Sequence, residues 1–310
     1  MRRMMLPPPG DGGSIEAQTT EDVSPVASVY AGRRAVLATM HGKEAAIGPS
    51  LHGRLGLAVD VATGIDTDSL GTFTGEVPRA GNMDEAAIAK ARLGMAASGA
   101  SIGIASEGSY GPHPQFPFVA AGVELLVFVD DERGLVVRER LVDDAPVYRH
   151  AAASSPAGLE RFLDAVRFPS HALIVRPNVF KDLHAQIHKG VRTLEELERA
   201  VADGARWSGD GLAFVQTDMR AHMNPSRMAV LGRLAGPLAE RLLCLCPACG
   251  APGYGVVEAA TGLPCAWCGG PTGLVRQEIF GCVACDSREA RERPDGLAEA
   301  DPGQCPACNP

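Results

Sequence analysis

Four Cys-x-x-Cys pairs lie close together at the C-terminal end of the chain. They account for eight of the nine cysteines, and no cysteine precedes Cys244. Two thiolates separated by two residues can bind one metal ion from a tight turn, and two such turns complete a tetrahedral four-thiolate site. Four pairs therefore predict two bound metal ions. The pairs are Cys246/Cys249, Cys265/Cys268, Cys282/Cys285 and Cys305/Cys308.

The spacing between the pairs favours two consecutive zinc ribbons. Fifteen residues separate Cys249 from Cys265, and nineteen separate Cys285 from Cys305. Both gaps suit a zinc site built from two such pairs. We therefore expect the first pair to join the second and the third to join the fourth, with interleaved pairing as the alternative. Zinc is favoured over iron because closed four-thiolate zinc sites are common structural elements, although four thiolates also suit iron.

The charge of the cysteine-rich region argues against a role in gripping nucleic acid. Residues 246–310 carry four arginines, no lysine and eight acidic residues, and the whole chain has a net charge of -8. A phosphate-binding surface needs cations. We therefore expect this module to stabilise the fold or to bind a protein partner. Trp267 is expected to pack in the ribbon core, and Cys244 to be a buried spare thiol.

A second set of candidate residues precedes the cysteines, close to the predicted ends of strands. Ligands bind beyond the carboxyl ends of strands in open α/β sheets. Carboxylates there can hold a magnesium ion, and Lys or Arg can neutralise phosphate oxygens, so this rim suits a magnesium-bound phosphate ester. The candidates are Lys43, Asp66, Asp68, Glu107, His113, Arg176, Asn178, Asp218, Arg220, His222 and Asn224.

The elements that would position these residues alternate between strands and helices over residues 31–245. This alternation predicts one α/β domain around a central sheet flanked by helices. An adjacent strand pair at 123–139 makes the predicted sheet mixed. The other strands are expected at 35–39, 57–62, 101–105, 171–176 and 212–217, and the helices at 44–55, 82–97, 159–167, 194–206 and 226–243. The predicted fold is thus α/β with a mixed central sheet, followed by a small double zinc-ribbon module at 246–310.

The first 30 residues differ from the rest in composition. They are rich in Pro, Gly, Ser and acidic residues, which predicts a disordered extension. No apolar run reaches the roughly 18 residues needed to cross a bilayer, and no segment has the form of a signal peptide. Clustered cysteine pairs without an export signal favour metal over disulfides, so we expect a cytoplasmic protein without a membrane role.

Several catalytic motifs are absent. The chain has no Walker A loop, no Gly-x-Gly-x-x-Gly after a strand and no His-Glu-x-x-His,. The nucleophile elbow Gly-x-Ser-x-Gly is nearly present around Ser109, but Glu107 occupies its first position,. A serine hydrolase is therefore disfavoured.

The first part of the chain resembles the inosine/xanthosine triphosphate pyrophosphatase superfamily. Ala-Thr-Met-His-Gly-Lys at 38–43, Gly-Thr-Phe-Thr-Gly-Glu at 71–76, Ala-Lys-Ala-Arg at 89–92 and Ile-Ala-Ser-Glu-Gly at 104–108 carry the likeness. It implies that Lys43 contacts phosphates, that Glu76 or Asp68 holds magnesium together with Glu107, and that Lys90 assists. The loop departs from the family pattern, since His41 replaces the usual Asn and Lys43 comes one residue early.

Nearly the whole chain, residues 33–310, resembles an uncharacterised bacterial family known as a domain of unknown function. His-Gly-Lys-Glu at 41–44, the 71–76 segment, residues 106–114 and 217–225, and the Cys-Pro-x-Cys-Gly start of the ribbons carry this resemblance. It implies no activity.

These observations lead to three hypotheses. The first is a magnesium-dependent hydrolase of a nucleotide or related phosphate ester, in which Asp68, Glu76 and Glu107 hold the metal and Asp218 or His222 is the base. The second is a binding protein that senses a small ligand and uses the ribbons to contact a partner. The third, nucleic-acid processing, is disfavoured by the acidic balance.

Overall fold

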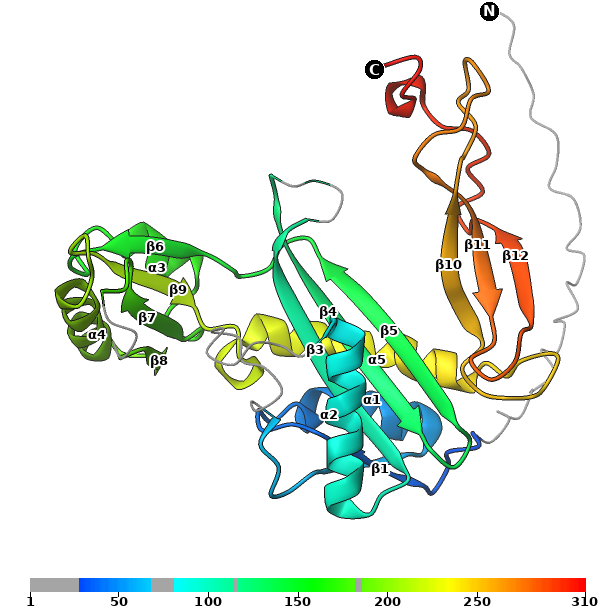
Figure 1. The fold of residues 1–310 in the computed structure, drawn as a ribbon, viewed down its shortest axis with the longest axis horizontal. Coiled ribbons are helices and arrows are strands. Elements are labelled where there is room, and N and C mark those ends of the chain that lie inside the picture. Colours follow the sequence, from blue (N-terminus) through cyan, green and yellow to red (C-terminus); the bar gives the residue numbers. More distant parts are fainter. Residues whose placement is uncertain (1–27, 68–80, 114–115, 117, 182–185) are drawn as a thin grey trace, which may run out of the picture.

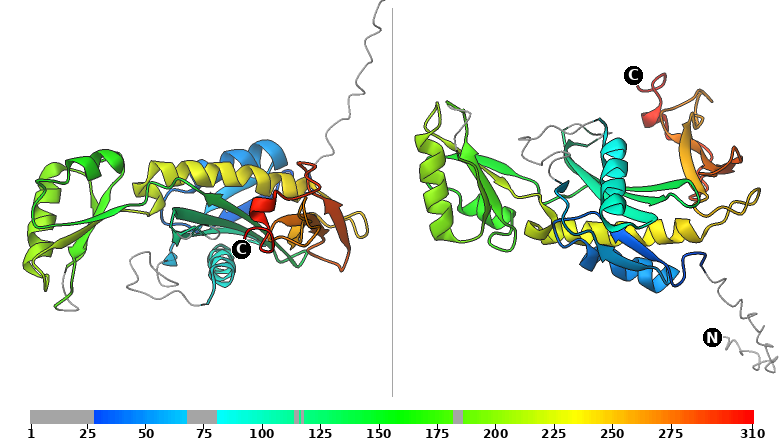
Figure 2. Two further views of the ribbon diagram at one scale, coloured as in Figure 1. Left: turned by 90° about the horizontal axis from the view of Figure 1, so that it is seen from above. Right: turned by 60° about the horizontal axis from the view of Figure 1, so that its bottom comes forward.

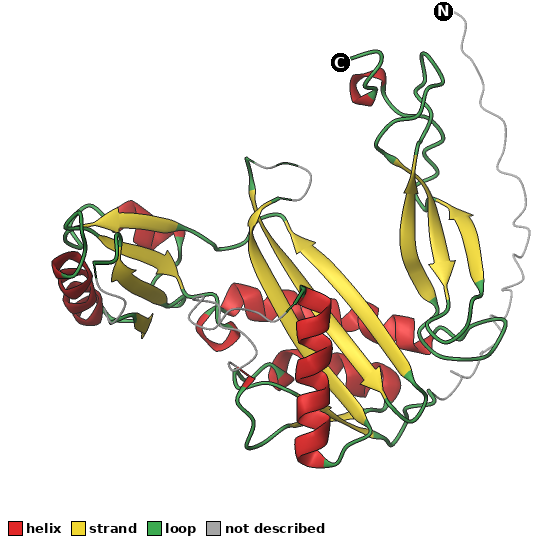
Figure 3. Ribbon diagram, viewed as in Figure 1, coloured by secondary structure: helices red, strands yellow, loops and turns green. Residues whose placement is uncertain are grey.

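The computed structural model describes residues 28–67, 81–113, 116, 118–181 and 186–310. The described strands form three sheets (Figure 1). The largest has the strand order β2-β1-β3-β4-β5 and carries the candidate residues discussed below. A second sheet follows in the chain, and the third belongs to the cysteine-rich region. Figure 3 shows helices against the first two sheets.

The five-stranded sheet is mixed, as predicted. β1 (Arg34–Leu37) pairs in parallel with β2 (Ala58–Val61) and with β3 (Ile102–Pro112). β4 (Ala120–Asp130) joins β3 and β5 (Leu135–Asp143) in antiparallel pairs. Together with the flanking helices and the cysteine clusters near the C-terminus, this sheet confirms the predicted fold class.

Helices cover both faces of this sheet because its strands are buried on both sides. α1 (Glu44–Leu55) and α5 (Pro225–Leu243) pack on one face, in a core that includes Ile102, Ile104 and Phe128. α2 (Met83–Ser98) packs on the other, over a core that includes Ala105 and Val127. Figure 2 shows this sheet between the helices. Alternate residues of β3 therefore face different helices.

The prediction of one sheet across residues 31–245 is wrong. β6 (His150–Ala153), β7 (Leu173–Pro177), β8 (His188–Val191) and β9 (Ala213–Thr217) form a separate antiparallel sheet in the order β6-β9-β7-β8. α3 (Glu160–Ala165) and α4 (Leu194–Arg206) accompany it, and α4 packs against its core. Alternating patterns locate strands, but they do not tell which strands pair, because pairing depends on contacts distant in sequence.

The structured part begins earlier than predicted. Residues 1–27 of the expected disordered extension lie outside the described residues. Tyr30, however, is fully buried, and its ring packs edge-on against Phe128 with centroids 5.0 Å apart. The core of the five-stranded sheet therefore includes a residue that the sequence assigned to the extension.

The cysteine-rich region forms the third sheet. β10 (Gly255–Thr261), β11 (Val275–Gly281) and β12 (Arg288–Glu292) are antiparallel in that order. The described residues also form two short 3-10 helices, η2 (Ala221–Met223) before α5 and η3 (Pro302–Gln304) before the last cysteine pair. None of the helices that the structure describes is long and apolar enough to cross a membrane.

Candidate functional site

Each cysteine pair with a following glycine folds as a tight turn that brings its two sulfurs together. The N–H of Gly250 donates to the carbonyl of Cys246 over 2.8 Å, and Gly269 repeats this bond to Cys265, also over 2.8 Å. Both glycines have a left-handed backbone, with φ of 72° and 69°, which a residue with a side chain adopts only at a cost. Backbone N–H groups also donate to the sulfurs, as Ala284 does to Cys282 over 3.2 Å. Such bonds stabilise thiolates.

The eight paired cysteines form two groups of four, and the pairing is interleaved. Cys246 and Cys249 meet Cys282 and Cys285, while Cys265 and Cys268 meet Cys305 and Cys308. The favoured sequential pairing is therefore wrong. The reason lies in the strand between the first two pairs, since the seven residues of β10 span roughly 20 Å when extended. The antiparallel hairpin then returns the third pair to the first.

The distances between the sulfurs fit four-thiolate zinc sites. In the first group, Cys246 and Cys285 are 3.8 Å apart and Cys249 and Cys282 are 3.6 Å apart. In the second group, the corresponding distances are 3.9 Å from Cys265 to Cys308 and 3.7 Å from Cys268 to Cys305. A tetrahedron with zinc–sulfur bonds of about 2.3 Å has edges of about 3.8 Å. Each group could therefore hold one zinc ion.

Two expectations for the ribbon side chains are wrong. Trp267 is 79% exposed instead of packing in a ribbon core, and Cys244 is exposed instead of buried. Trp267 lies inside the turn between Cys265 and Cys268. The tight turn leaves no interior for a large ring, so the side chain lies in solvent.

The other candidate site lies at the carboxyl end of β1. The connection from β1 through α1 leads to β2 on one side, and the connection through α2 leads to β3 on the other. α1 and α2 cover opposite faces. This reversal of strand order is the position at which open α/β sheets bind ligands. The loop after β1 ends at Lys43, which is the first residue before α1.

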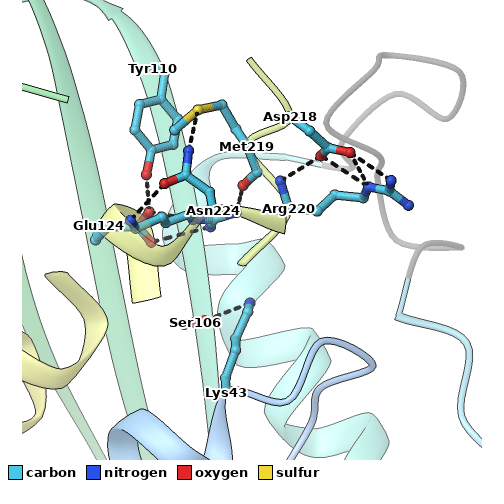
Figure 4. Close-up of polar contacts among 9 residues, drawn as sticks. Lys43, Ser106, Tyr110, Glu124, Asp218, Met219, Arg220 and Asn224 are labelled. Atoms are coloured by element: carbon cyan, nitrogen blue, oxygen red, sulfur yellow. Dashed lines mark hydrogen bonds and ion pairs between the residues drawn. The ribbon is translucent and has the colours of Figure 1, made fainter. Parts of the chain in front are cut away.

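Lys43 is buried at this position. Its Nζ donates a hydrogen bond of 2.8 Å to Oγ of Ser106 on β3 (Figure 4). Burial and then the neighbouring Arg227 guanidinium lower the pKa of Lys43, Glu124 and Glu107 oppose this shift, and the resulting pKa is about 7. No carboxylate in the described part of the chain forms an ion pair with Lys43. Burial therefore favours the neutral form of this amine.

A buried network lies beside Lys43 on the same face of the sheet. Arg227 of α5 donates from Nε to Oε1 of Glu124 on β4 over 2.7 Å, and Tyr110 donates to the same carboxylate. Glu124 is fully buried and Arg227 is 3% exposed. Gly108 faces this pair, and a Cβ atom there would lie 2.6 Å from the guanidinium. The glycine therefore allows the ion pair to lie against β3.

Glu107 faces the opposite helix. It lies directly opposite Leu125 of β4, which belongs to the core under α2, and it forms an ion pair with Lys90 of α2. Glu107 lies inside β3, whereas the predicted strand ended at Ala105. The prediction stopped there because Ser-Glu-Gly is typical of a turn, but pairing with β4 extends the strand to Pro112.

Asp218 and Arg220 follow β9 and bind each other. The guanidinium of Arg220 contacts both oxygens of Asp218, with a shortest distance of 2.6 Å (Figure 4). The N–H of Gly190 donates to the same carboxylate. Asp218 is fully buried. These bonds hold the carboxylate in place, so it is poorly placed to accept a proton from water.

A pair of stacked histidine rings connects this segment with the loop after β1. His41 and His222 are parallel within 12°, with ring centroids 4.5 Å apart. His222 is exposed, and His41 is partly buried. Burial, followed by the charge of Lys43, lowers the pKa of His41 to about 3. His41 is therefore neutral at physiological pH.

Two of the residues predicted for the site, Arg176 and His113, lie away from the carboxyl end of β1. Arg176 stacks on Phe214 at 4.2 Å, at the end of β7 that pairs with the start of β9. Asp218 follows the other end of β9, so the two residues occupy opposite ends of the second sheet. His113 lies beyond the end of β3 and contacts Asp144 over 3.2 Å. The prediction that Arg176 joins Lys43 at one rim is therefore wrong.

The structure also places residues that the sequence prediction did not select. Ser106 bonds to Lys43, Glu124 and Arg227 act on its charge, and Tyr110 donates to Glu124. A signal was present for two of them, since Glu124 interrupts an apolar strand and Arg227 follows the buried periodicity of α5. Asp68 and Glu76 lie outside the described residues, so their predicted contacts are not compared.

Comparison with known proteins gives one family. The domain of unknown function DUF6671 matches residues 90–310, which is more than half of the chain. The matched region begins at Lys90, includes Glu107, Glu124 and Arg227, and extends through both cysteine groups, whereas Lys43 precedes it. None of the curated proteins matches the chain. The chain belongs to the DUF6671 family.

Proposed function

We propose that the protein binds and hydrolyses a small phosphate ester, such as a nucleotide, at the carboxyl end of β1. The observation that carries this proposal is the buried Lys43 amine, which bonds to the Ser106 hydroxyl and has no carboxylate partner among the described residues. A buried amine of this kind gains most from an anion that brings its own negative charge.

The start of α1 supports the same ligand class. The ends of helices leave backbone N–H groups without helical partners, and the helix dipole favours an anion at the N-terminus. Side chains cap the N-termini of α2, α4 and α5, but no side chain caps α1 or the short α3. A phosphate group at this position would meet both the helix terminus and Lys43.

Magnesium is not part of the proposed steps. Glu107 is the predicted ligand that lies among the described residues, and Lys90 neutralises its carboxylate. The described residues that could form metal clusters are the two cysteine groups. The resemblance of residues 35–110 to the inosine/xanthosine triphosphate pyrophosphatases finds no support in the family match. The proposal therefore depends on the geometry around Lys43.

The proposed hydrolysis uses water as the nucleophile. A water oxygen bonds to phosphorus, the bond from phosphorus to the leaving oxygen breaks, and the leaving oxygen takes up a proton. His222 is the proposed base because its ring is exposed and stacked on His41, two residues before Lys43,. Lys43 would neutralise charge on the phosphate oxygens.

Anion binding at Lys43 has a measurable consequence for protons. The pKa of Lys43 is about 7 in the structure, and a bound phosphate raises it because an opposite charge favours the ammonium form. Above pH 7, binding therefore takes up a proton, and affinity falls as the pH increases further. Calorimetry in two buffers of different ionisation enthalpy measures this uptake, which a Lys43→Met variant should lose.

The decisive experiment is an assay of phosphate and diphosphate release from a panel of nucleotides and simple phosphate esters, with magnesium and with chelator. Lys43→Met should reduce kcat/KM by about a hundredfold. Arg92→Gln, on the exposed side of α2, is the control and should retain turnover. Release of neither product from the zinc-loaded protein under any of these conditions would remove the hydrolase proposal.

A second candidate function is ligand binding without turnover. Arg220 and Lys90 hold the carboxylates of Asp218 and Glu107, and this favours a site that recognises an anion without transferring a proton. The ribbons would then contact a protein partner. Tight nucleotide binding without product release would select this function, and Lys43→Met would weaken the binding. The eight metal-binding thiols suit a reducing compartment such as the cytoplasm.

A further inference from the structure

The two cysteine groups differ in how they join the rest of the molecule. We call Cys246, Cys249, Cys282 and Cys285 the proximal cluster, and Cys265, Cys268, Cys305 and Cys308 the distal cluster. The proximal cluster follows directly after α5, whereas the distal cluster lies at the other end of the β10–β11 hairpin (Figure 1).

Side chains of the five-stranded sheet and α5 fix the proximal cluster. Arg241 of α5 donates to the carbonyl of Gly253 over 3.2 Å, and it binds Glu139 of β5 over 2.9 Å. Gly253 lies so close to β5 that a Cβ atom would be 2.6 Å from Val137. Val283, between the two cysteines of the third pair, packs against the core of the large sheet. The proximal cysteines are therefore positioned by contacts that do not depend on a metal ion.

The distal cluster has contacts of a different kind. Ala300 bridges to Cys265, and its carbonyl accepts from the N–H of Ala266 over 3.0 Å. These partners belong to the C-terminal segment that itself supplies Cys305 and Cys308. Trp267, within this cluster, is 79% exposed. The distal cysteines are thus brought together by the ribbon itself.

The sheet between the clusters has little apolar core. All five residues of β12 are exposed, and most residues of β10 are exposed as well. A small sheet needs a buried face or another constraint to be stable alone. The stability of the β10–β12 sheet therefore depends on the cysteine clusters at its two ends. The proximal cluster is the one attached to the core of the large sheet.

We propose that the two metal ions bind in order, the proximal ion before the distal ion, and that the proximal ion creates the distal site by ordering β10–β12. Binding at the proximal cluster fixes the start of β10 against the end of β11. The hairpin register then places the second pair at the far end, and β12 directs the C-terminal segment toward it. The distal pairs no longer have to close a long flexible loop, so their affinity increases. This inference is independent of the proposed hydrolysis.

The test compares two matched double variants of the full chain, C282S/C285S in the proximal cluster and C305S/C308S in the distal cluster. Metal-free protein under reducing conditions is titrated with zinc, and native mass spectrometry counts the bound ions. Hydrogen exchange follows β10–β12 and, as a check on folding, β3 and β4. C244S is the control, because Cys244 belongs to neither cluster.

We expect C305S/C308S to bind one zinc ion with the affinity of the proximal site and to keep β10 and β11 protected. C282S/C285S should bind the distal ion about tenfold or more weakly, with loss of protection in all three strands. C244S should bind two ions. An unchanged distal affinity in C282S/C285S would overturn the proposal, and so would equal weakening of the remaining site in both variants.

Discussion

The five-stranded sheet and the ribbon, which comprises β10–β12 and the two cysteine clusters, are stabilised by different interactions. The large sheet buries apolar side chains on both faces and places charged groups such as Arg227 and Glu124 inside. The ribbon leaves most of β10 and β12 exposed and has eight cysteines at its ends. Burial holds the first region together, and metal ligation is expected to hold the second. Loss of metal should therefore act on the ribbon, whereas loss of a buried charge and change of pH should act on the large sheet.

Metal removal should have the largest effect and should be confined to the ribbon. Zinc contributes about 10–16 kcal/mol to the folding of small zinc-dependent peptides, and β10–β12 have little apolar core to replace it. Chelation under reducing conditions should therefore abolish the hydrogen-exchange protection of β10–β12 while β3 and β4 remain protected. Equal loss of protection in both regions would show that they are not independent.

Loss of one buried charge should have the next largest effect, on the large sheet. Arg227→Met leaves the fully buried Glu124 carboxylate without its cation, so the free energy of unfolding should fall by about 3–5 kcal/mol. Arg54→Met is the matched control, because its ion pair with Glu240 also involves α5 but is exposed, and it should cost less than about 1 kcal/mol. Urea denaturation measures both changes. Similar losses in the two variants would contradict the buried role of Arg227.

Lys43 should make the stability of the large sheet depend on pH. Its pKa is lowered from 10.5 to about 7 in the folded chain, so between these values the unfolded chain holds a proton that the folded chain has released. The free energy of unfolding should therefore rise with pH over this range. Lys43→Met removes the effect and should be more stable than the natural chain at pH 7 by roughly 2–4 kcal/mol.

Denaturation at several pH values from 7 to 10 measures this difference, which should shrink as the pH increases. The lowered pKa of His41, about 3, acts below this range and does not interfere. A stability difference that stays constant from pH 7 to pH 10 would show that Lys43 is charged in the folded protein.

The smallest effect is expected at the exposed tip of the ribbon. Trp267 is 79% exposed, so Trp267→Ala should change the free energy of unfolding and the zinc content very little, within about 0.5 kcal/mol. Thermal denaturation and metal analysis test this. A large loss of zinc would show that the ring shields the distal cluster.

The prediction from sequence succeeded where the signal is local. Cys-x-x-Cys turns, the helix expected at 82–97 and the apolar strands each depend on residues close in the chain. The prediction failed where the structure depends on contacts between segments far apart in the chain. The interleaved cysteine groups, the second sheet and the extension of β3 past Glu107 each depend on pairing with a strand elsewhere in the chain.

The candidate site shows the same division. Lys43 and Glu107 were found from their positions after or near apolar strands, but their partners Ser106 and Lys90 come from other elements. Arg176 is a candidate from the sequence because it also lies at the end of a strand. Because β7 and β9 are antiparallel, however, Arg176 lies at the opposite end of the second sheet from Asp218.

The sequence by itself determined that this protein has an α/β fold and two possible four-thiolate metal sites, because residue type and short-range spacing are sufficient for both. Only the tertiary structure decided which cysteines share a site and which charged groups surround Lys43. The physical reason is that ligation and electrostatic interaction act over a few ångströms in space, and the chain brings residues within that distance through strand pairing and helix packing that no local pattern specifies.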